Sequence, residues 1–158
     1  MAKVGQAKRG LKGWGCIIVA SIAVFVLPCS SVANAAEWIK TYGGADFDQL
    51  SSIQQTSDGG YVVAGGTASF GSGRGDAWVL KLDAGGNIQW QKTYGSIAVE
   101  EAFSIQQTSD GGYVVAGEMQ SWTADLSDAW VLKLDGSGNI QWQKTFGVPD
   151  YGRAESIR

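Results

Sequence analysis

The sequence has no histidine, two prolines and two cysteines in 158 residues. Histidine is the commonest general base near neutral pH and the commonest metal ligand, so its absence excludes a Ser-His-Asp or Cys-His nucleophilic site built from this chain. Both cysteines, Cys16 and Cys29, lie near the N-terminus. The rest of the chain therefore has no thiol for a disulfide or for metal binding.

The N-terminal segment is typical of a secretory signal peptide. Four basic residues precede an apolar run at Trp14–Leu27, and Ala33 and Ala35 supply the small residues of a cleavage site. We predict cleavage after Ala35 and a secreted or extracytoplasmic location, in the periplasm or at the cell surface. One alternative is a membrane anchor, but the run is shorter than the roughly 20 residues that span a bilayer. Another is a lipoprotein signal at Cys29, which Pro28 disfavours because that peptidase requires a small residue there.

Removal of residues 1–35 leaves eight basic and fifteen acidic residues, a net charge of −7. Nucleic acids and anionic membranes bind basic surfaces, so neither is an expected partner. The mature chain also has no apolar run long enough to suggest a membrane span.

An internal repeat organises the rest of the chain. The stretch SIQQTSDGGYVVAG occurs at Ser52–Gly65 and again, unchanged, 52 residues later at Ser104–Gly117. The segments Asp76–Asp83 and Gly86–Thr93 recur unchanged at the same spacing. A fixed period of this length indicates a repeat architecture.

Each repeat predicts four short strands. In the first repeat they are Ser52–Thr56, Tyr61–Gly65, Ala77–Leu82 and Ile88–Tyr94. The second and third are nearly continuous apolar runs, typical of strands covered on both faces, whereas the fourth alternates and belongs at an outer edge. The predicted fold class is all-β, with two four-stranded antiparallel propeller-type blades in an incomplete β-propeller.

The repeats set the expected boundaries. The propeller region covers 36–158 and divides into a fragment of a fourth strand at 37–43, blade 1 at about 44–95, blade 2 at about 96–147 and the start of blade 3 at 148–158. Propellers close with four to eight blades. We therefore expect the N-terminal part of a longer ring, or self-association through open apolar blade faces. We expect Trp38–Tyr42 to pair with little in a single chain, or to borrow a blade edge.

Three motifs carry a family resemblance: DAWVLKLD, WQKTYG after a Gly-Asn turn, and DGGYVVAG. Together they resemble bacterial extracytoplasmic β-propeller repeats of the SBBP type, over nearly all of the mature chain. The resemblance implies the propeller fold and a secreted or surface location. It also implies an association with glycan-active proteins, but it brings no catalytic motif to any residue here.

The repeated Asp-Gly-Gly motifs predict structural turns, because aspartate caps its own backbone and glycine tolerates positive φ; this pattern favours tight primed hairpins. The turn residues are Asp58, Gly59, Gly60, Asp110, Gly111 and Gly112. Metal or substrate binding by Asp58 and Asp110 is the alternative. Asp83 and Asp135 open the other turn, where the ligand density of a calcium loop is missing. No metal or cofactor is predicted.

The recurring tryptophans, at 38, 90 and 142 and at 78 and 130, are interpreted as packing between blades rather than as sugar-stacking platforms. Two connections differ between the repeats: Gly66–Gly75 against Glu118–Ser127, and Gly44–Ser51 against Ser96–Phe103. Both lie at one end of an up-and-down blade, so variation gathers on one face. Scaffolded loops often carry function, although unconstrained drift explains the variation equally well.

The candidate binding residues on this face are acidic or aromatic and suit a cation or a polyol: Asp46, Asp48, Glu100, Glu101, Trp122 and Asp125. Two functions remain open. The first is a binding or structural module for a protein or a glycan, with no catalytic site. The second is part of a glycan-active protein, either a carbohydrate-binding module or an endoglucanase-like glycoside hydrolase, whose two carboxylates would lie about 5–9 Å apart. A buried, aromatic-lined pair of acids with a raised pKa would favour the enzyme.

Overall fold

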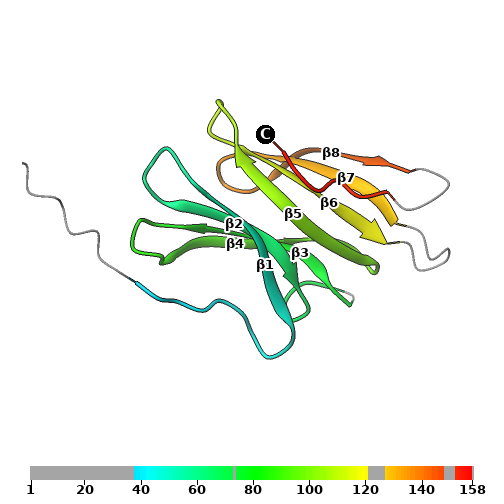
Figure 1. Cartoon of the computed structure of the whole chain (residues 1–158), viewed down its shortest axis with the longest axis horizontal. Coiled ribbons are helices and arrows are strands. Elements are labelled where there is room, and N and C mark those ends of the chain that lie inside the picture. Colours follow the sequence, from blue (N-terminus) through cyan, green and yellow to red (C-terminus); the bar gives the residue numbers. More distant parts are fainter. Residues whose placement is uncertain (1–37, 73, 121–126, 148–151, 158) are drawn as a thin grey trace, which may run out of the picture. The chain divides into compact units, whose positions relative to one another are not determined.

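The computed structural model describes residues 38–72, 74–120, 127–147 and 152–157 (Figure 1). The predicted signal peptide and two candidate site residues, Trp122 and Asp125, lie outside these ranges. The described part of the chain is all-β and contains no helix. It accordingly holds no helix that is long and apolar enough to cross a membrane.

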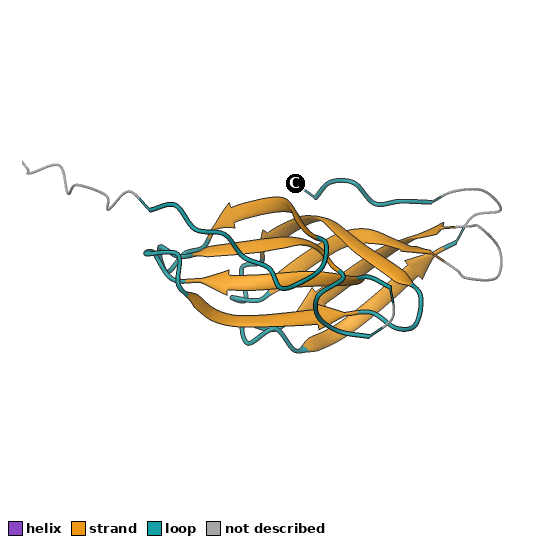
Figure 2. Cartoon of the chain, turned by 90° about the horizontal axis from the view of Figure 1, so that it is seen from below, coloured by secondary structure: helices purple, strands orange, loops and turns teal. Residues whose placement is uncertain are grey.

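Two four-stranded antiparallel sheets make up the fold, one for each repeat (Figures 1 and 2). Blade 1 consists of β1 (Asp48–Gln55), β2 (Tyr61–Thr67), β3 (Asp76–Leu82) and β4 (Ile88–Tyr94). Blade 2 consists of β5 (Val99–Gln107), β6 (Tyr113–Gln120), β7 (Ser127–Leu134) and β8 (Ile140–Phe146). In each sheet the strands are neighbours in sequence order. The predicted meander, with its apolar second and third strands in the centre, is therefore confirmed.

The hairpin turns differ from the primed two-residue turns that the Asp-Gly pattern favours. The amide of Gly59 donates to the carbonyl of Thr56 at 2.9 Å, and the amide of Thr56 donates to the carbonyl of Gly60 at 2.9 Å. This closes a three-residue loop in which Gly59 has a φ of 82°. A left-handed glycine at the end of a three-residue loop is the usual solution for this hairpin length. The other hairpins repeat the pattern, with left-handed glycines at Gly86, Gly111 and Gly138.

The first strand of each blade begins earlier than predicted. β1 starts at Asp48 rather than Ser52, and it pairs with β2 through a bulge between Leu50 and Ser52. β5 repeats the bulge between Ala102 and Ser104. At a bulge two residues of one strand lie opposite a single residue of its partner, so the alternation of apolar and polar side chains is lost. The first half of the strand therefore gives no alternating sequence pattern.

The two blades stack face to face, with β5 lying against β1, β2 and β3 of blade 1. One apolar cluster joins both sheets and contains Val62, Ala64, Ala77, Val79 and Tyr94 of blade 1 with Ala102, Ile105, Tyr113, Val115, Trp130, Leu132 and Leu134 of blade 2. A second cluster lies on the other face of blade 1 and contains Val63, Trp78, Leu80 and Leu82. These four residues are the repeat counterparts of Val115, Trp130, Leu132 and Leu134. The same face of each blade is therefore apolar. In blade 2 this face packs against blade 1.

The N-terminal segment occupies on blade 1 the place that β4 occupies on blade 2. Trp38 meets Tyr61 edge-on at 5.9 Å, as Trp90 meets Tyr113 at 5.9 Å. The hydroxyl of Tyr42 donates to the carbonyl of Gly86 at 2.8 Å, and Tyr94 makes the equivalent bond at 2.7 Å. As expected, residues 38–42 join no strand ladder. These residues therefore make the contacts that a fourth strand makes with the next blade, but they are not paired with the strands of any sheet.

The C-terminal residues copy the first strand of a following blade in the same way. The amide of Ile157 donates to the hydroxyl of Ser104 at 3.2 Å, as the amide of Ile105 donates to Ser52 at 3.4 Å. The amide of Gly152 donates to the carbonyl of Ser127 at 2.7 Å. Both ends of the described chain therefore repeat the contacts found at the junction between the two blades.

Candidate functional site

The varied connections lie together at one end of the strands, as predicted from the up-and-down order. We call this region the rim and define it as residues 43–47, 68–72, 74–75 and 95–98. Its parts are joined by hydrogen bonds: the hydroxyl of Ser72 donates to the carbonyl of Ser96 at 3.3 Å, and the amide of Asp46 donates to the hydroxyl of Ser69 at 2.9 Å. A bridge between Gly75 and Val99 links the rim of blade 1 to blade 2. The described rim of blade 1 therefore continues into the 95–98 connection and the start of β5.

Asp48 organises the rim of blade 1 from the start of β1. Its carboxylate accepts hydrogen bonds from the hydroxyl of Thr67, from the hydroxyl of Ser69 at 2.8 Å and from the amide of Gly44 at 2.7 Å. These bonds, that from Thr67 above all, hold the pKa of Asp48 below its ordinary value. The carboxylate is thus occupied in fixing two loops, and it is not a free ligand on the surface.

Apolar side chains on the rim reach solvent. Phe47 is 72% exposed and Ile97 is 79% exposed. A cavity of about 140 Å³ lies beside Phe47 and is also lined by Gln49, Arg74 and Glu101. The side-chain amide of Gln49 donates to the carboxylate of Glu101. This bond joins blade 1 to blade 2 at the wall of the cavity. Two of the predicted residues, Glu100 and Glu101, line this cavity, whereas Asp46 is exposed on the rim outside its lining.

Glu100 departs from the predicted acidic surface, because it is buried at 1% exposure. One carboxylate oxygen, Oε1, accepts from the hydroxyl of Ser96 at 2.8 Å and from its amide at 3.2 Å. The other oxygen, Oε2, is buried and has no hydrogen-bond partner. The pattern of acids in the loop did not predict this burial, which results from the packing of β5 against β3.

A second buried acid, Asp76, faces Glu100 from β3 and is 3% exposed. A methyl group on Gly95 would lie 2.4 Å from Oδ1 of Asp76 and 2.6 Å from Oε2 of Glu100, so the two oxygens are no more than about 5 Å apart by the triangle rule. Burial raises the pKa of Asp76, and the nearby Glu100 adds to the rise. Sequence reasoning missed Asp76 because it recurs as Asp128 and was therefore assigned to the framework.

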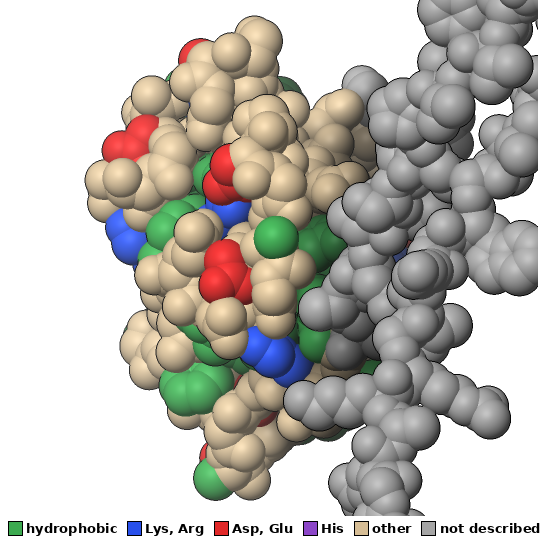
Figure 3. Space-filling view, turned by 90° about the vertical axis from the view of Figure 1, so that its left-hand side faces the viewer, with side chains coloured by type: hydrophobic (Ala, Val, Ile, Leu, Met, Phe, Trp, Pro, Cys, Tyr) green, Lys and Arg blue, Asp and Glu red, His purple; other side chains and the backbone are tan. Residues whose placement is uncertain are grey.

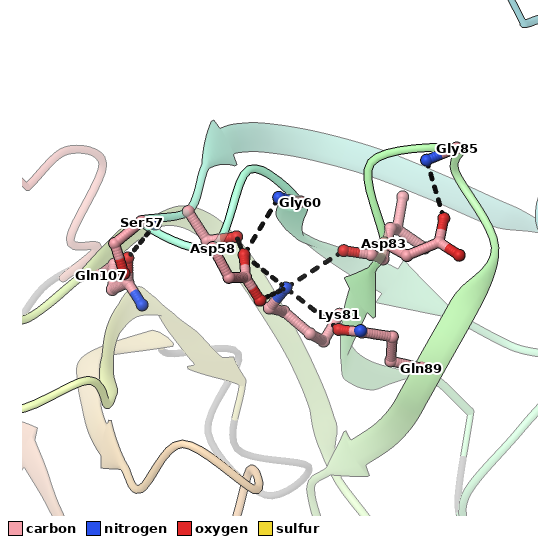
Figure 4. Close-up of polar contacts among 10 residues, drawn as sticks. Ser57, Asp58, Gly60, Lys81, Asp83, Gly85, Gln89 and Gln107 are labelled. Carbon is pink, nitrogen blue, oxygen red and sulfur yellow. Dashed lines mark hydrogen bonds and ion pairs between the residues drawn. The ribbon is translucent and has the colours of Figure 1, made fainter.

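The predicted turn residues have structural roles. Oδ1 of Asp58 accepts from the amide of Gly60 at 3.0 Å and from the hydroxyl of Thr56 (Figure 4). Its Oδ2 pairs with the ammonium of Lys81 at 2.8 Å, although the Lys81 side chain is only 6% exposed. Lys81 also donates to the carbonyl of Leu82 at 3.1 Å. Asp110 and Lys133 repeat the pair at 2.9 Å in blade 2.

The pair predicts a measurable loss of stability and a defined pH dependence. Asp58→Ala should lower the free energy of unfolding by about 2 kcal/mol at pH 7, because it removes a turn cap and leaves a buried ammonium with fewer partners. Asp58→Asn keeps an acceptor for Gly60, so it should lose about 1 kcal/mol, since solvent screens the half-exposed carboxylate. Chemical denaturation measures both values; equal losses would contradict a role for the Gly60 cap, and no loss in Asp58→Asn would contradict a role for the charge.

Hydrogen bonds, first among them the bond from Lys81, hold the pKa of Asp58 well below its ordinary value. A depressed folded-state pKa contributes stability that is fully present above the unfolded pKa of about 3.9 and is lost as the pH falls toward the folded-state value. The stability difference between the wild type and Asp58→Asn should therefore shrink below about pH 4. A difference that stays constant down to pH 2 would show that the charge contributes nothing.

The other hairpin turn uses its aspartate in the same way. Oδ1 of Asp83 accepts from the amides of Gly85 and Asn87, both at 2.8 Å. Acidic and basic side chains lie close together at this end of blade 1, which Figure 3 shows. The described residues hold no group of three or more Asp, Glu, Cys or His side chains placed to bind a metal ion. The hairpin aspartates thus serve the turns.

No protein-family model matches the chain, and no curated protein matches it significantly. Functional inference therefore depends on the residues of the rim and on the contacts between the blades.

Proposed function

We propose that the chain is an extracytoplasmic β-propeller repeat module of the SBBP type, with a binding or structural role. Its rim presents the varied connections of neighbouring blades as one surface to a protein or a glycan. The observation that carries this proposal is the exposure of Phe47 beside the cavity at Gln49 and Glu101, with Ile97 exposed elsewhere on the rim. Apolar groups on an otherwise polar rim are typical of binding surfaces.

The packing of blade 1 against blade 2 also supports self-association of the chain. Blade 1 and blade 2 pack through two complementary faces, and the repeat places a copy of each face on the outside of the pair. On the outer side of blade 2, Ile140, Trp142 and Phe146 are 48%, 45% and 56% exposed. On the outer side of blade 1, an apolar cavity of about 240 Å³ is lined by Trp38, Tyr42, Leu50, Ile53, Val63 and Leu82. We propose that these faces meet in a second copy of the chain, which would extend the rim.

The alternative, a glycoside hydrolase, needs two carboxylates that a sugar can reach. Oxygens of Asp76 and Glu100 lie no more than about 5 Å apart, at or below the lower end of that spacing, and the two residues are 3% and 1% exposed. A sugar ring could not contact either carboxylate in this arrangement. The geometry therefore favours binding over hydrolysis.

A panel of soluble glycans, assayed for binding and for released reducing ends, tests the proposal. We expect binding without new reducing ends, and we expect Phe47→Ser to weaken it at least tenfold, because Phe47 is the exposed aromatic beside the rim cavity. Ile88→Ser is the matched control, since Ile88 is 45% exposed but lies at the start of β4, beside the turn at Asp83. New reducing ends would support the hydrolase, and equal loss in both variants would argue against a rim site.

A further inference from the structure

We propose that Asp76 and Glu100 bind one divalent cation of the calcium type at the junction between the two blades. Asp76 comes from β3 of blade 1 and Glu100 from β5 of blade 2. A cation shared by the two carboxylates would join the blades directly. The site lies beneath the rim cavity, which Glu100 also lines.

The first argument is the lack of a partner for a buried charge. Oε2 of Glu100 is buried without a hydrogen bond, while Oε1 is held by Ser96 and Oδ2 of Asp76 accepts from the amide of Ser72 at 2.9 Å. An ionised carboxylate that is removed from water is strongly destabilising unless a positive charge accompanies it. Two such groups within about 5 Å of each other add mutual repulsion. A bound cation would remove both effects.

The second argument is the type and spacing of the donors. The two carboxylates and the hydroxyl of Ser96 beside Glu100 supply oxygen donors, and hard oxygen donors of this kind select calcium or magnesium. Calcium binds oxygen at about 2.3–2.6 Å, so an oxygen separation of no more than about 5 Å lets one ion contact both carboxylates. With two carboxylates, the other ligands must be neutral oxygens or water. The expected affinity is therefore weak, with a Kd on the order of 0.1–1 mM.

The third argument is that the repeat builds this pair at one junction and not at the next. Asp128 is the counterpart of Asp76, and its Oδ1 would lie 2.8 Å from a methyl group on Gly147. The counterpart of Glu100 after blade 2 is Gly152, which has no carboxylate. Asp128 therefore occupies the same place in the repeat with no carboxylate at the position equivalent to Glu100, and it provides a matched control.

The experiment uses the purified chain after treatment with a chelator. Calorimetric titration with calcium chloride should show one ion bound per chain. Addition of 10 mM calcium chloride should raise Tm by about 3–8 °C, and the same ionic strength of sodium chloride should not. Glu100→Gln and Asp76→Asn should each abolish the calcium-dependent rise, while Asp128→Asn should keep it. Both site variants should be at least as stable as the wild type without calcium, because they remove the repulsion between the carboxylates.

Two results would overturn the proposal. The first is a wild-type Tm that does not respond to calcium, whatever the stability of the neutral variants, which would show that the pair binds no calcium ion. The second is a calcium response that survives in Glu100→Gln and Asp76→Asn, which would place the ion elsewhere. Glycan binding by the rim is measured separately, so failure of the cation site leaves the proposed function standing.

Discussion

Gly65→Ala is expected to lower the free energy of unfolding by about 3 kcal/mol. A methyl group on Gly65 would lie 2.0 Å from the carbonyl oxygen of Gln49 and 2.8 Å from Cα of Leu50. Both atoms belong to the backbone of β1 beside the bulge, where the strand cannot move away without breaking its ladder with β2. Urea denaturation, followed by tryptophan fluorescence, measures the loss.

The neighbouring glycine is the control. A methyl group on Gly66 would meet only the Glu101 side chain, at 3.5 Å, which is an ordinary contact. Gly66→Ala should therefore change stability by less than about 1 kcal/mol. If the two alanine variants were equally stable, the close approach of β1 to β2 would be wrong. Gly117 repeats the close approach in blade 2, with a methyl group 1.9 Å from the carbonyl oxygen of Glu101.

Trp130→Ala should lower the free energy of unfolding by about 3–5 kcal/mol, the usual range for removing a buried large aromatic. Trp130 is 2% exposed and belongs to the cluster that joins the two blades. Its removal leaves a cavity at the junction, so both blades should lose stability in one transition. Separate melting of the blades in the wild type would contradict this coupling.

Trp142→Ala is the matched control, because Trp142 lies on β8 and is 45% exposed. In a single chain this change should reduce stability by less than about 1 kcal/mol. Light scattering of the intact wild-type chain should give a mass above that of one chain, and Trp142→Ala should reduce it, because the outer face of blade 2 loses its largest apolar group. A wild-type chain that remains monomeric at high concentration would rule out self-association through this face.

Much of the fold was predictable because the sequence of the blade occurs twice in the chain. Glycines at the hairpins and apolar runs in the second and third strands are local signals, and they placed the strands, the turns and the order within each sheet correctly. Local signals failed at the bulges, where β1 and β5 lose their alternation. They also failed at the turn type, since an Asp-Gly pair suits both two-residue and three-residue loops.

The candidate site was predictable only as a region. The comparison of the two repeats located the rim, but equivalent acids within it differ in role. Asp48 and Glu100 are 52 residues apart and occupy the same place in the repeat. Asp48 is bonded to Thr67 and Ser69 of its own blade, whereas Glu100 faces Asp76 of the preceding blade. The difference arises because β5 packs against blade 1, whereas the described chain has no blade in the equivalent position beside β1. No local sequence pattern encodes this packing.

The sequence by itself determined the repeat, the all-β class and the identity of the turn residues, because strand period and left-handed glycines depend on neighbours in the chain. The tertiary structure alone decided which copies are buried. β4 and β8 share the sequence IQWQKT, yet Tyr94 at the end of β4 is 6% exposed and Phe146 at the end of β8 is 56% exposed. Blade 2 covers Tyr94, whereas Phe146 lies on the outer side of blade 2. Burial depends on the surface that packs against a strand, so identical segments acquire different environments through their position in the stack.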